Sequence, residues 1–192
     1  DLAKTVFHLV GLNSSGTVVL KKRIYRDELS EYIANFPKTK IAMEACSGSH
    51  YWGRKFRDYG HEVRLIAPQF VKPYVKTNKN DMKDAEAIAE AASRPTMRFV
   101  PLKSEEQQDI QSLHRIRERL VGNRTTIGNQ IRGLAGEYGI VFPKSIKKLL
   151  TNLAEALEKN KDRLSALLLD SFYDLREEFI AVDLQIKLCE KK

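Results

Sequence analysis

The order of strand-like and helix-like patterns is the feature that most constrains how this chain can fold. It opens with two strand-like runs, 5–12 and 17–24, joined by the turn Asn13-Ser14-Ser15-Gly16, which predicts a β-hairpin. Helical and strand-like segments then alternate: a helix over 26–36, a strand over 39–46, a helix over 51–59 and a strand over 61–66. This order predicts an α/β domain over residues 1–102, with a mixed sheet and flanking helices.

Local signals add detail to this domain. Asp27 is a candidate cap for the first helix, and the mostly apolar run 39–46 is typical of a central strand covered on both faces. Residues 68–80 contain two prolines, which favours a loop that leads into a helix starting at Asp81.

After residue 102 the pattern becomes helical. A long helical pattern begins at Ser104, and four glycines interrupt it, so we expect either a bend or the close approach of another backbone: Gly122, Gly128, Gly133 and Gly136. A second helix is predicted over 146–157. In the last segment seven apolar residues alternate four and three apart, the seam of a coiled coil: Leu168, Phe172, Leu175, Phe179, Val182, Ile186 and Cys189. Residues 103–192 therefore predict an all-α coiled-coil arm that pairs with another helix or with its own copy, as a homodimer or higher oligomer.

Composition limits the functional classes. The net charge of +8 and pI of about 9.4 favour a polyanionic partner such as nucleic acid. The two cysteines are too far apart to suggest a disulfide framework or a zinc site, which indicates a reduced, cytoplasmic setting. The four scattered histidines, His8, His50, His61 and His114, show no metal-ligand spacing, and we interpret each as an ordinary surface or packing histidine. No run reaches the roughly 18 apolar residues of a membrane span, so no membrane partner is expected. The chain begins with Asp1 at a strand-like segment, and we expect an upstream segment to precede it.

The helix predicted from Asp81 carries the first unusual feature. Four small apolar residues form one stripe at helical period, Ala85, Ile88, Ala89 and Ala92. This stripe is the face expected to pack on a core, and Asp81 and Asp84 continue it toward the start of the helix, so both acids are expected on the buried side. Capping and the helix dipole favour acids there, and this is the alternative to a metal-binding or catalytic role.

Two further acids stand out. Glu44 lies in the apolar run 39–46, where an ionised carboxylate is costly unless a cation or a metal ion pairs with it. A salt bridge to a nearby lysine is the alternative there. Asp1 precedes the first strand-like run, and by itself it is no evidence for a site. Four carboxylates brought together would repel one another, and divalent cations remove that penalty. Oxygen ligands alone favour Mg²⁺ or Mn²⁺, and two such ions can stabilise a phosphoryl transfer.

The ordered acids carry a family resemblance. The runs Asp1-Leu2-Ala3-Lys4, Met43-Glu44-Ala45-Cys46-Ser47-Gly48 and Asn80-Asp81-x-x-Asp84-Ala85, followed by an arginine-rich helix that ends near Gly133-x-x-x-Glu137-Tyr138-Gly139-Ile140, resemble an insertion-sequence transposase. The chain is similar to the amino-terminal DEDD domain of the Piv/MooV-type DNA recombinases, also called the insertion-sequence one-ten family. The Asp-x-x-Asp motif alone is weak evidence for this family, whereas the ordered set of acids is strong evidence for it.

The resemblance implies a RuvC-like ribonuclease H fold in which Asp1, Glu44, Asp81 and Asp84 are catalytic residues and bind two Mg²⁺ or Mn²⁺ ions. It also implies DNA as substrate, a structured guide RNA as partner, and a carboxy-terminal domain that supplies a nucleophilic serine. That domain and the strand expected before Asp1 are absent from the sequence, so the chain alone is expected to be incomplete for recombination. The resemblance also predicts a residue of higher helix propensity at position 136, where this chain has glycine.

Basic residues supply candidate phosphate contacts. Four lysines surround the acidic stretch and four arginines follow the long helix: Lys72, Lys76, Lys79, Lys83, Arg115, Arg119, Arg124 and Arg132. A solvated, charge-balanced face is the alternative for each of them. Two other functions stay open at this point, a stand-alone Holliday-junction-type endonuclease and a non-catalytic nucleic-acid-binding dimerisation module.

Overall fold

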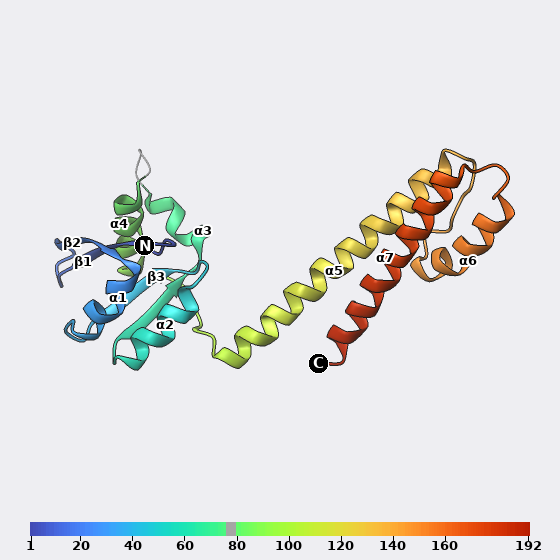
Figure 1. Cartoon of the computed structure of the whole chain (residues 1–192). Coiled ribbons are helices and arrows are strands. Elements are labelled where there is room, and N and C mark those ends of the chain that lie inside the picture. The colour runs from blue at the N-terminus through green and yellow to red at the C-terminus, as the bar shows by residue number, and fades with distance from the viewer. Residues whose placement is uncertain (76–79) are drawn as a thin grey trace. The chain divides into compact units, whose positions relative to one another are not determined.

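The computed structural model describes residues 1–75 and 80–192. The chain divides into two compact units, Asp1–Glu106 and Gln107–Lys192, which are described separately (Figure 1). The first is an α/β unit and the second is all-helical. The boundary predicted at residue 102 lies between the last strand of the first unit and the long helix that follows it.

The predicted hairpin is present. Strand β1 (Val6–Leu12) pairs antiparallel with β2 (Val18–Tyr25), with Val6 opposite Tyr25. The Asn13 side chain closes the turn, because its Oδ1 accepts hydrogen bonds from the backbone N–H of Ser15 at 3.1 Å and of Thr17 at 2.8 Å. This is the usual role of asparagine in a tight turn.

A separate three-stranded sheet follows, in the order β3-β4-β5. Strands β3 (Lys40–Glu44) and β4 (Glu62–Ile66) are parallel, and β5 (Phe99–Val100) is antiparallel to β4. The mixed sheet is therefore confirmed. The central position predicted for residues 39–46 is wrong, because in the described part of the chain β3 pairs with β4 alone.

Helices on both faces explain why the β3 sequence is so apolar. On one face α1 (Arg26–Ala34) and α2 (Ser49–Asp58) form a core that includes Phe7, Leu29, Met43, Trp52, Phe56 and Leu65. On the other face α3 (Pro68–Val71) and α4 (Asp81–Ala92) form a second core that includes Ile66, Val71, Ala87, Ile88 and Ala91. An edge strand buried on both faces has the same composition as a central strand.

Two local predictions in this unit are wrong. Asp27 does not cap α1, because the N-cap position is Tyr25 and Asp27 instead accepts a hydrogen bond from the Glu28 N–H at 3.2 Å. The loop predicted over 68–80 contains α3 and the short 3₁₀ helix η1 (Lys72–Tyr74). Pro68 occupies the first turn of α3, where a missing N–H costs no hydrogen bond.

The second unit contains α5 (Glu105–Gly136), α6 (Ile146–Lys159) and α7 (Ala166–Glu190), whose apolar faces share one core. Helix α5 continues through all four glycines predicted to mark a bend or a close approach. At Gly128 an added methyl group would lie 3.4 Å from both Leu149 and Phe179, so a neighbouring surface does approach there. At Gly122, Gly133 and Gly136 nothing lies within 4 Å of that position.

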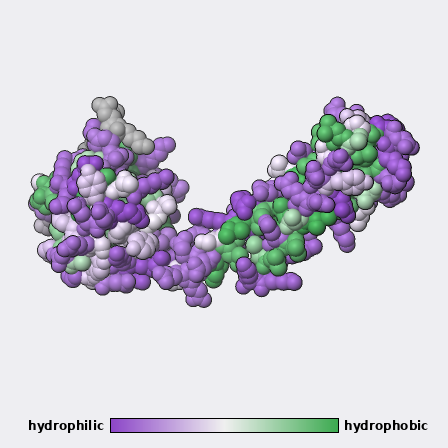
Figure 2. All heavy atoms as spheres, viewed as in Figure 1, coloured by the Kyte–Doolittle hydropathy of each residue, from purple (hydrophilic) through white to green (hydrophobic). Residues whose placement is uncertain are grey.

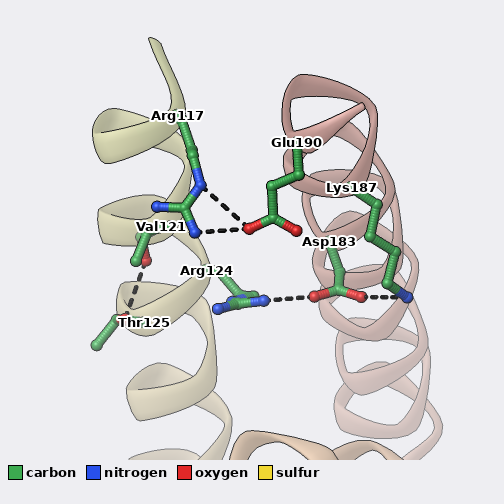
Figure 3. Close-up of polar contacts among 7 residues, drawn as sticks. All are labelled: Arg117, Val121, Arg124, Thr125, Asp183, Lys187 and Glu190. Carbon is green, nitrogen blue, oxygen red and sulfur yellow. Dashed lines mark hydrogen bonds and ion pairs between the residues drawn. The ribbon is translucent and has the colours of Figure 1, made fainter. Parts of the chain in front are cut away.

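The apolar seam of α7 faces its own chain. Its residues Phe172, Phe179, Val182 and Ile186 are buried in the core shared with α5 and α6. Arg117 of α5 pairs with Glu190 of α7, and Arg124 of α5 pairs with Asp183 of α7 (Figure 3). The second pair lies seven residues later in α5 and seven residues earlier in α7, so the two long helices run antiparallel. The predicted pairing of this seam with another helix is thus met by α5, and the seam gives no argument for a dimer.

The Arg124–Asp183 pair is the more enclosed of these two contacts. Arg124 Nη1 lies 2.5 Å from Asp183 Oδ1, and Lys187 Nζ lies 2.8 Å from the other carboxylate oxygen (Figure 3). Hydrogen bonding from Lys187 and Arg124 holds the pKa of the Asp183 carboxyl below its usual range, against the opposing effect of burial. The pair therefore fixes the register between α5 and α7.

The surface of the helical unit carries apolar patches on the face drawn in Figure 2. Exposed large apolar side chains on α5, on α7 and on the connection between α5 and α6 include Ile110, Ile116, Val141, Leu167, Ile180, Leu184 and Leu188. Among the helices of residues 1–75 and 80–192, none has the length and apolar character needed to cross a membrane.

Candidate metal and nucleic-acid site

The N-terminal turn of α4 presents two of the predicted acids. Asn80 caps the helix, and its side chain accepts a hydrogen bond from the Lys83 N–H at 2.9 Å. Asp81 is the first helical residue and Asp84 lies one turn further on. The helix dipole favours acids at this position, and this is the alternative to a metal-binding or catalytic role.

The predicted burial of both acids needs correction. The Asp81 side chain is 65% exposed, and Asp84 is half-buried. Full burial begins only at Ala85, one turn into the helix, so the packed stripe does not extend to Asp81. The buried residues of α4 are Ala85, Ala87, Ile88 and Ala91, whereas Ala89 and Ala92 are half-buried. The packing face is therefore rotated from the predicted stripe.

Asp1 lies beside the middle of β1. Its α-amino group donates to the His8 carbonyl at 2.8 Å, and the His8 N–H donates to the Asp1 carbonyl at 3.3 Å. On the same residue, the His8 imidazole Nδ1 lies 3.8 Å from Asp81 Oδ2. His8 thus contacts both Asp1 and Asp81.

Sequence reasoning missed His8, which we had interpreted as an ordinary surface or packing histidine. Its side chain is 12% exposed, and its Nδ1 has no hydrogen-bond partner in the part of the chain that the structure describes. A polar position on β1, in a strand that packs against α4, was the signal available. By contrast, His61 is a packing histidine as expected, buried with its Nε2 3.0 Å from the Ile33 carbonyl oxygen.

Glu44 is the last residue of β3 and is half-buried. A salt bridge from Glu44 to a nearby lysine was the alternative, and it finds no support in the described residues. Lys40 pairs with Glu62 instead, at 3.9 Å. Helix α4 packs on β1, β3 and β4, so the strand that carries Glu44 and the helix that carries Asp81 and Asp84 are direct neighbours.

Electrostatic effects at Asp1 show that the acids share one neighbourhood. Burial lowers the pKa of the Asp1 α-amino group to about 6, and the nearby side chains of Cys46, Glu44, Asp84 and Asp81 act in the opposite direction. Burial likewise raises the pKa of the Cys46 thiol, and the Glu44 carboxylate raises it further. Glu44, Asp81 and Asp84 are therefore near enough to the amino end of Asp1 for their charges to act on it.

The acids are neighbours without forming a closed ligand cage. Within the residues described, no three histidine, cysteine or carboxylate side chains lie close enough together to hold a metal ion. Like charges resist close approach without a cation between them. The donor set is carboxylate oxygen only, which suits Mg²⁺ and Mn²⁺ better than zinc.

The basic residues predicted to contact phosphate fall into two groups. Lys72 is exposed on η1, and Lys83 is half-buried on α4 beside the acids; Lys76 and Lys79 lie outside the described residues. On α5, Arg115 and Arg119 are exposed.

The other two arginines make contacts inside the helical unit. Arg124 binds Asp183, and Arg132 donates to the carbonyl oxygens of Pro143 at 3.1 Å and Lys144 at 2.8 Å. Their guanidinium groups thus tie α5 to its neighbours.

Comparison with known proteins identifies the family. The family model for DEDD transposases of the IS110 type, described as "Transposase", matches residues 1–140. The chain belongs to this transposase family. The recognised acids Asp1, Glu44, Asp81 and Asp84 all fall within the matched residues.

Curated relatives agree with this assignment. A "Probable family 20 transposase" of Pseudomonas aeruginosa is 44% identical over 193 residues, which cover 100% of this chain and 57% of the relative. A "Putative transposase y4pF/y4sB" of Sinorhizobium fredii is 46% identical over 195 residues, covering 100% and 49%. The "Transposase for insertion sequence element IS1111A" of Coxiella burnetii is 48% identical over 153 residues, covering 80% and 42%. The chain therefore spans about half the length of the curated relatives it matches.

Proposed function

We propose that this chain acts as the amino-terminal part of a DNA transposase that uses divalent metal ions to cleave and join phosphodiester bonds. The observation that carries the proposal is the packing of α4, which carries Asp81 and Asp84, against β3, which carries Glu44, and against β1, where His8 contacts both Asp1 and Asp81, in a chain of the IS110 DEDD family. Metal binding, DNA binding and the binding of a structured guide RNA are all parts of this proposal.

In this proposal the four carboxylates hold two Mg²⁺ or Mn²⁺ ions. Asp81 is exposed and the other three are half-buried, so their oxygens are available to a cation. When bound, such ions stabilise charge on the attacking and leaving oxygens of the phosphodiester. His8 is a positioning residue, because its backbone holds Asp1 and its imidazole lies against Asp81.

The finer fold assignment is also a proposal. A RuvC-like ribonuclease H arrangement is compatible with a hairpin and a mixed sheet that are both contacted by α4. A further domain with a nucleophilic serine would complete recombination, in keeping with relatives about twice as long as this chain.

Nucleic-acid contacts are proposed for the basic residues beside the acids and on the outer side of α5. Lys72 lies on η1, Lys83 lies within the acidic turn of α4, and Arg115 and Arg119 are exposed. Such side chains position a phosphate backbone without reading its sequence. Assembly into a dimer or higher oligomer would use a surface other than the filled α7 seam, and Ile180, Leu184 and Leu188 are exposed on that helix.

Substitution of one metal ligand tests the proposal. Asp84→Asn is expected to abolish metal-dependent DNA cleavage by the transposase that carries this chain, while nucleic-acid binding stays nearly intact, because an amide is a poorer metal ligand than a carboxylate. The matched control is Glu90→Gln on the same helix, whose carboxylate is 2.7 Å from Arg94 Nη2. Unchanged cleavage by Asp84→Asn, or equal loss in both variants, would refute the assigned site.

A further inference from the structure

A cavity of about 540 Å³ lies where the hairpin meets the first turns of α1 and α2. Its wall includes Tyr25, Arg26 and Asp27 from one side and Tyr51, Trp52 and Lys55 from the other. None of the four DEDD acids lines it. The cavity is therefore a feature separate from the proposed metal site, within the same unit.

Exposed aromatic rings line this cavity. Tyr25 is 51% exposed and Tyr51 is 48% exposed, which is high for tyrosine in a folded unit. Tyr51 packs edge-on against Trp52, with ring centroids 5.2 Å apart and an interplanar angle of 74°. Trp52 is itself buried in the core and so holds Tyr51 in place. Such rings offer stacking faces to any planar base.

Two cations stand next to the rings. The Arg26 guanidinium carbon lies 5.4 Å from the Trp52 ring centroid, and Lys55 Nζ lies 5.6 Å from the same centroid and 5.9 Å from that of Tyr51. Across residues 1–75 and 80–192, no ion pair joins either cation to a carboxylate, although Asp27 shares the wall. Arg26 Nη1 donates to the Lys4 carbonyl oxygen at 3.3 Å, and the other guanidinium N–H groups and the Lys55 ammonium are available to a phosphate group.

Trp52, which lines the cavity, carries a buried polar atom. The Trp52 side chain is 4% exposed, and its indole Nε1–H is buried without a hydrogen-bond acceptor in the described chain. An orphaned buried donor costs free energy, and such groups in native proteins commonly mark a site completed by a ligand or water. The Asp27 carboxylate adds an acceptor for the amino groups of a base.

We propose that this cavity binds one unstacked nucleotide of a single-stranded nucleic acid. The base stacks on Tyr51 and Tyr25, and the phosphate lies between Arg26 and Lys55. Single-stranded DNA and RNA share this chemistry, so the two are separated by experiment. The proposal rests on the nucleic-acid binding proposed above, and adds a binding site that does not involve the metal ligands.

Trp52 supplies a direct readout, because it is the single tryptophan of the chain. Short single-stranded oligonucleotides of one sequence, as DNA and as RNA, are titrated while Trp52 emission and the anisotropy of a label on the oligonucleotide are recorded. We expect a saturable emission change whose midpoint matches that from anisotropy. The form that binds more tightly, DNA or RNA, identifies the natural source of the nucleotide.

Variants then localise the effect. Tyr51→Ala removes a stacking face and should weaken binding roughly 5- to 150-fold, the range that corresponds to loss of one stacked base. Tyr51→Phe keeps the ring and should bind like the parent. The control Tyr173→Ala removes an equally exposed tyrosine from α7 and should change nothing. Lys55→Ala leaves the aromatic core intact and should flatten the salt dependence of binding. Its control is Lys147→Ala on α6.

Three results decide between the proposals. Oligonucleotide binding that neither alters Trp52 emission nor weakens in Tyr51→Ala and Lys55→Ala would overturn the cavity as a site, and would leave nucleic-acid binding elsewhere on the chain standing. Absence of any oligonucleotide binding would overturn both. Binding lost in Tyr51→Ala but retained in Tyr51→Phe and in Tyr173→Ala would support the cavity as the site.

Discussion

Two glycines of α5 that look alike in sequence should respond differently to substitution. Gly122 is exposed, and a methyl group added there meets nothing within 4 Å. Alanine is favoured over glycine in a helix interior by about 0.8–1 kcal/mol, so Gly122→Ala should stabilise the helical unit by about 0.5–1 kcal/mol. Gly128 is buried against Leu149, Phe179 and Arg132, each 3.4 Å from the added methyl group.

At Gly128 crowding opposes the helix preference. Contacts of 3.4 Å are at the limit of ordinary packing, so Gly128→Ala should be nearly neutral. Gly128→Leu adds three further carbons to a filled site and should destabilise by about 1–3 kcal/mol, the usual cost of overpacking. For a unit the size of Gln107–Lys192, about 1 kcal/mol corresponds to a shift of about 4–8 °C in the melting temperature.

Helical circular dichroism during thermal and urea unfolding measures these changes. Trp52 lies in the other unit, so its emission transition serves as an internal control and should not move. Equal stabilisation by Gly122→Ala and Gly128→Ala, or tolerance of Gly128→Leu, would refute the close packing of α5 on α6 and α7 at this position.

Three other outcomes follow from the same contacts. Phe179→Ala empties a fully buried position and should cost the helical unit about 3–5 kcal/mol in urea unfolding, unlike Leu184→Ala on the exposed side. Asn80→Ala removes the side-chain cap of α4 and should lower the stability of the α/β unit by about 1 kcal/mol, monitored by Trp52 emission; no change would show that the cap is unused. The pKa of the Asp183 carboxyl is lower in the native state than in the unfolded chain, so the unfolded chain binds more protons at a pH between these two pKa values. The stabilisation that Asp183 gives is therefore complete above about pH 4 and is lost as the pH falls through the native pKa. Asp183→Asn should therefore flatten the acid limb of the helical unit's stability curve, and an unchanged limb would contradict the role of its contacts with Lys187 and Arg124.

Local patterns were sufficient to predict most elements of this chain. Two strand-like runs joined by a turn that begins with asparagine predicted the hairpin, and four-and-three spacing predicted the buried face of α7. These are short-range signals that depend on residues close in sequence. The ordered acids were recognised on the same basis, from motifs at strand and helix ends.

Partners in space were harder to predict. The apolar run of β3 indicates burial on both faces but not the number of neighbouring strands, so an edge strand was assigned to the centre. The α7 seam indicates a helical partner but not whether it belongs to the same chain, and α5 proved to be that partner. Both errors concern long-range contacts.

The same limit applies to the candidate sites. His8 becomes notable only because a backbone pairing brings Asp1 beside it and α4 brings Asp81 to its imidazole. The cavity around Tyr51 and Trp52 joins the starts of two helices that are separate in sequence. Neither arrangement has a sequence spacing from which it could be inferred.

Titration of the chain with Mn²⁺, followed by the loss of free-ion electron paramagnetic resonance signal, tests the central claim most directly. The parent and Glu90→Gln should bind Mn²⁺ alike, whereas Glu44→Gln, Asp81→Asn and Asp84→Asn should each weaken binding at least about tenfold, as expected when a charged ligand is lost. Binding that is equal in the parent and in all three acid variants would contradict the metal site.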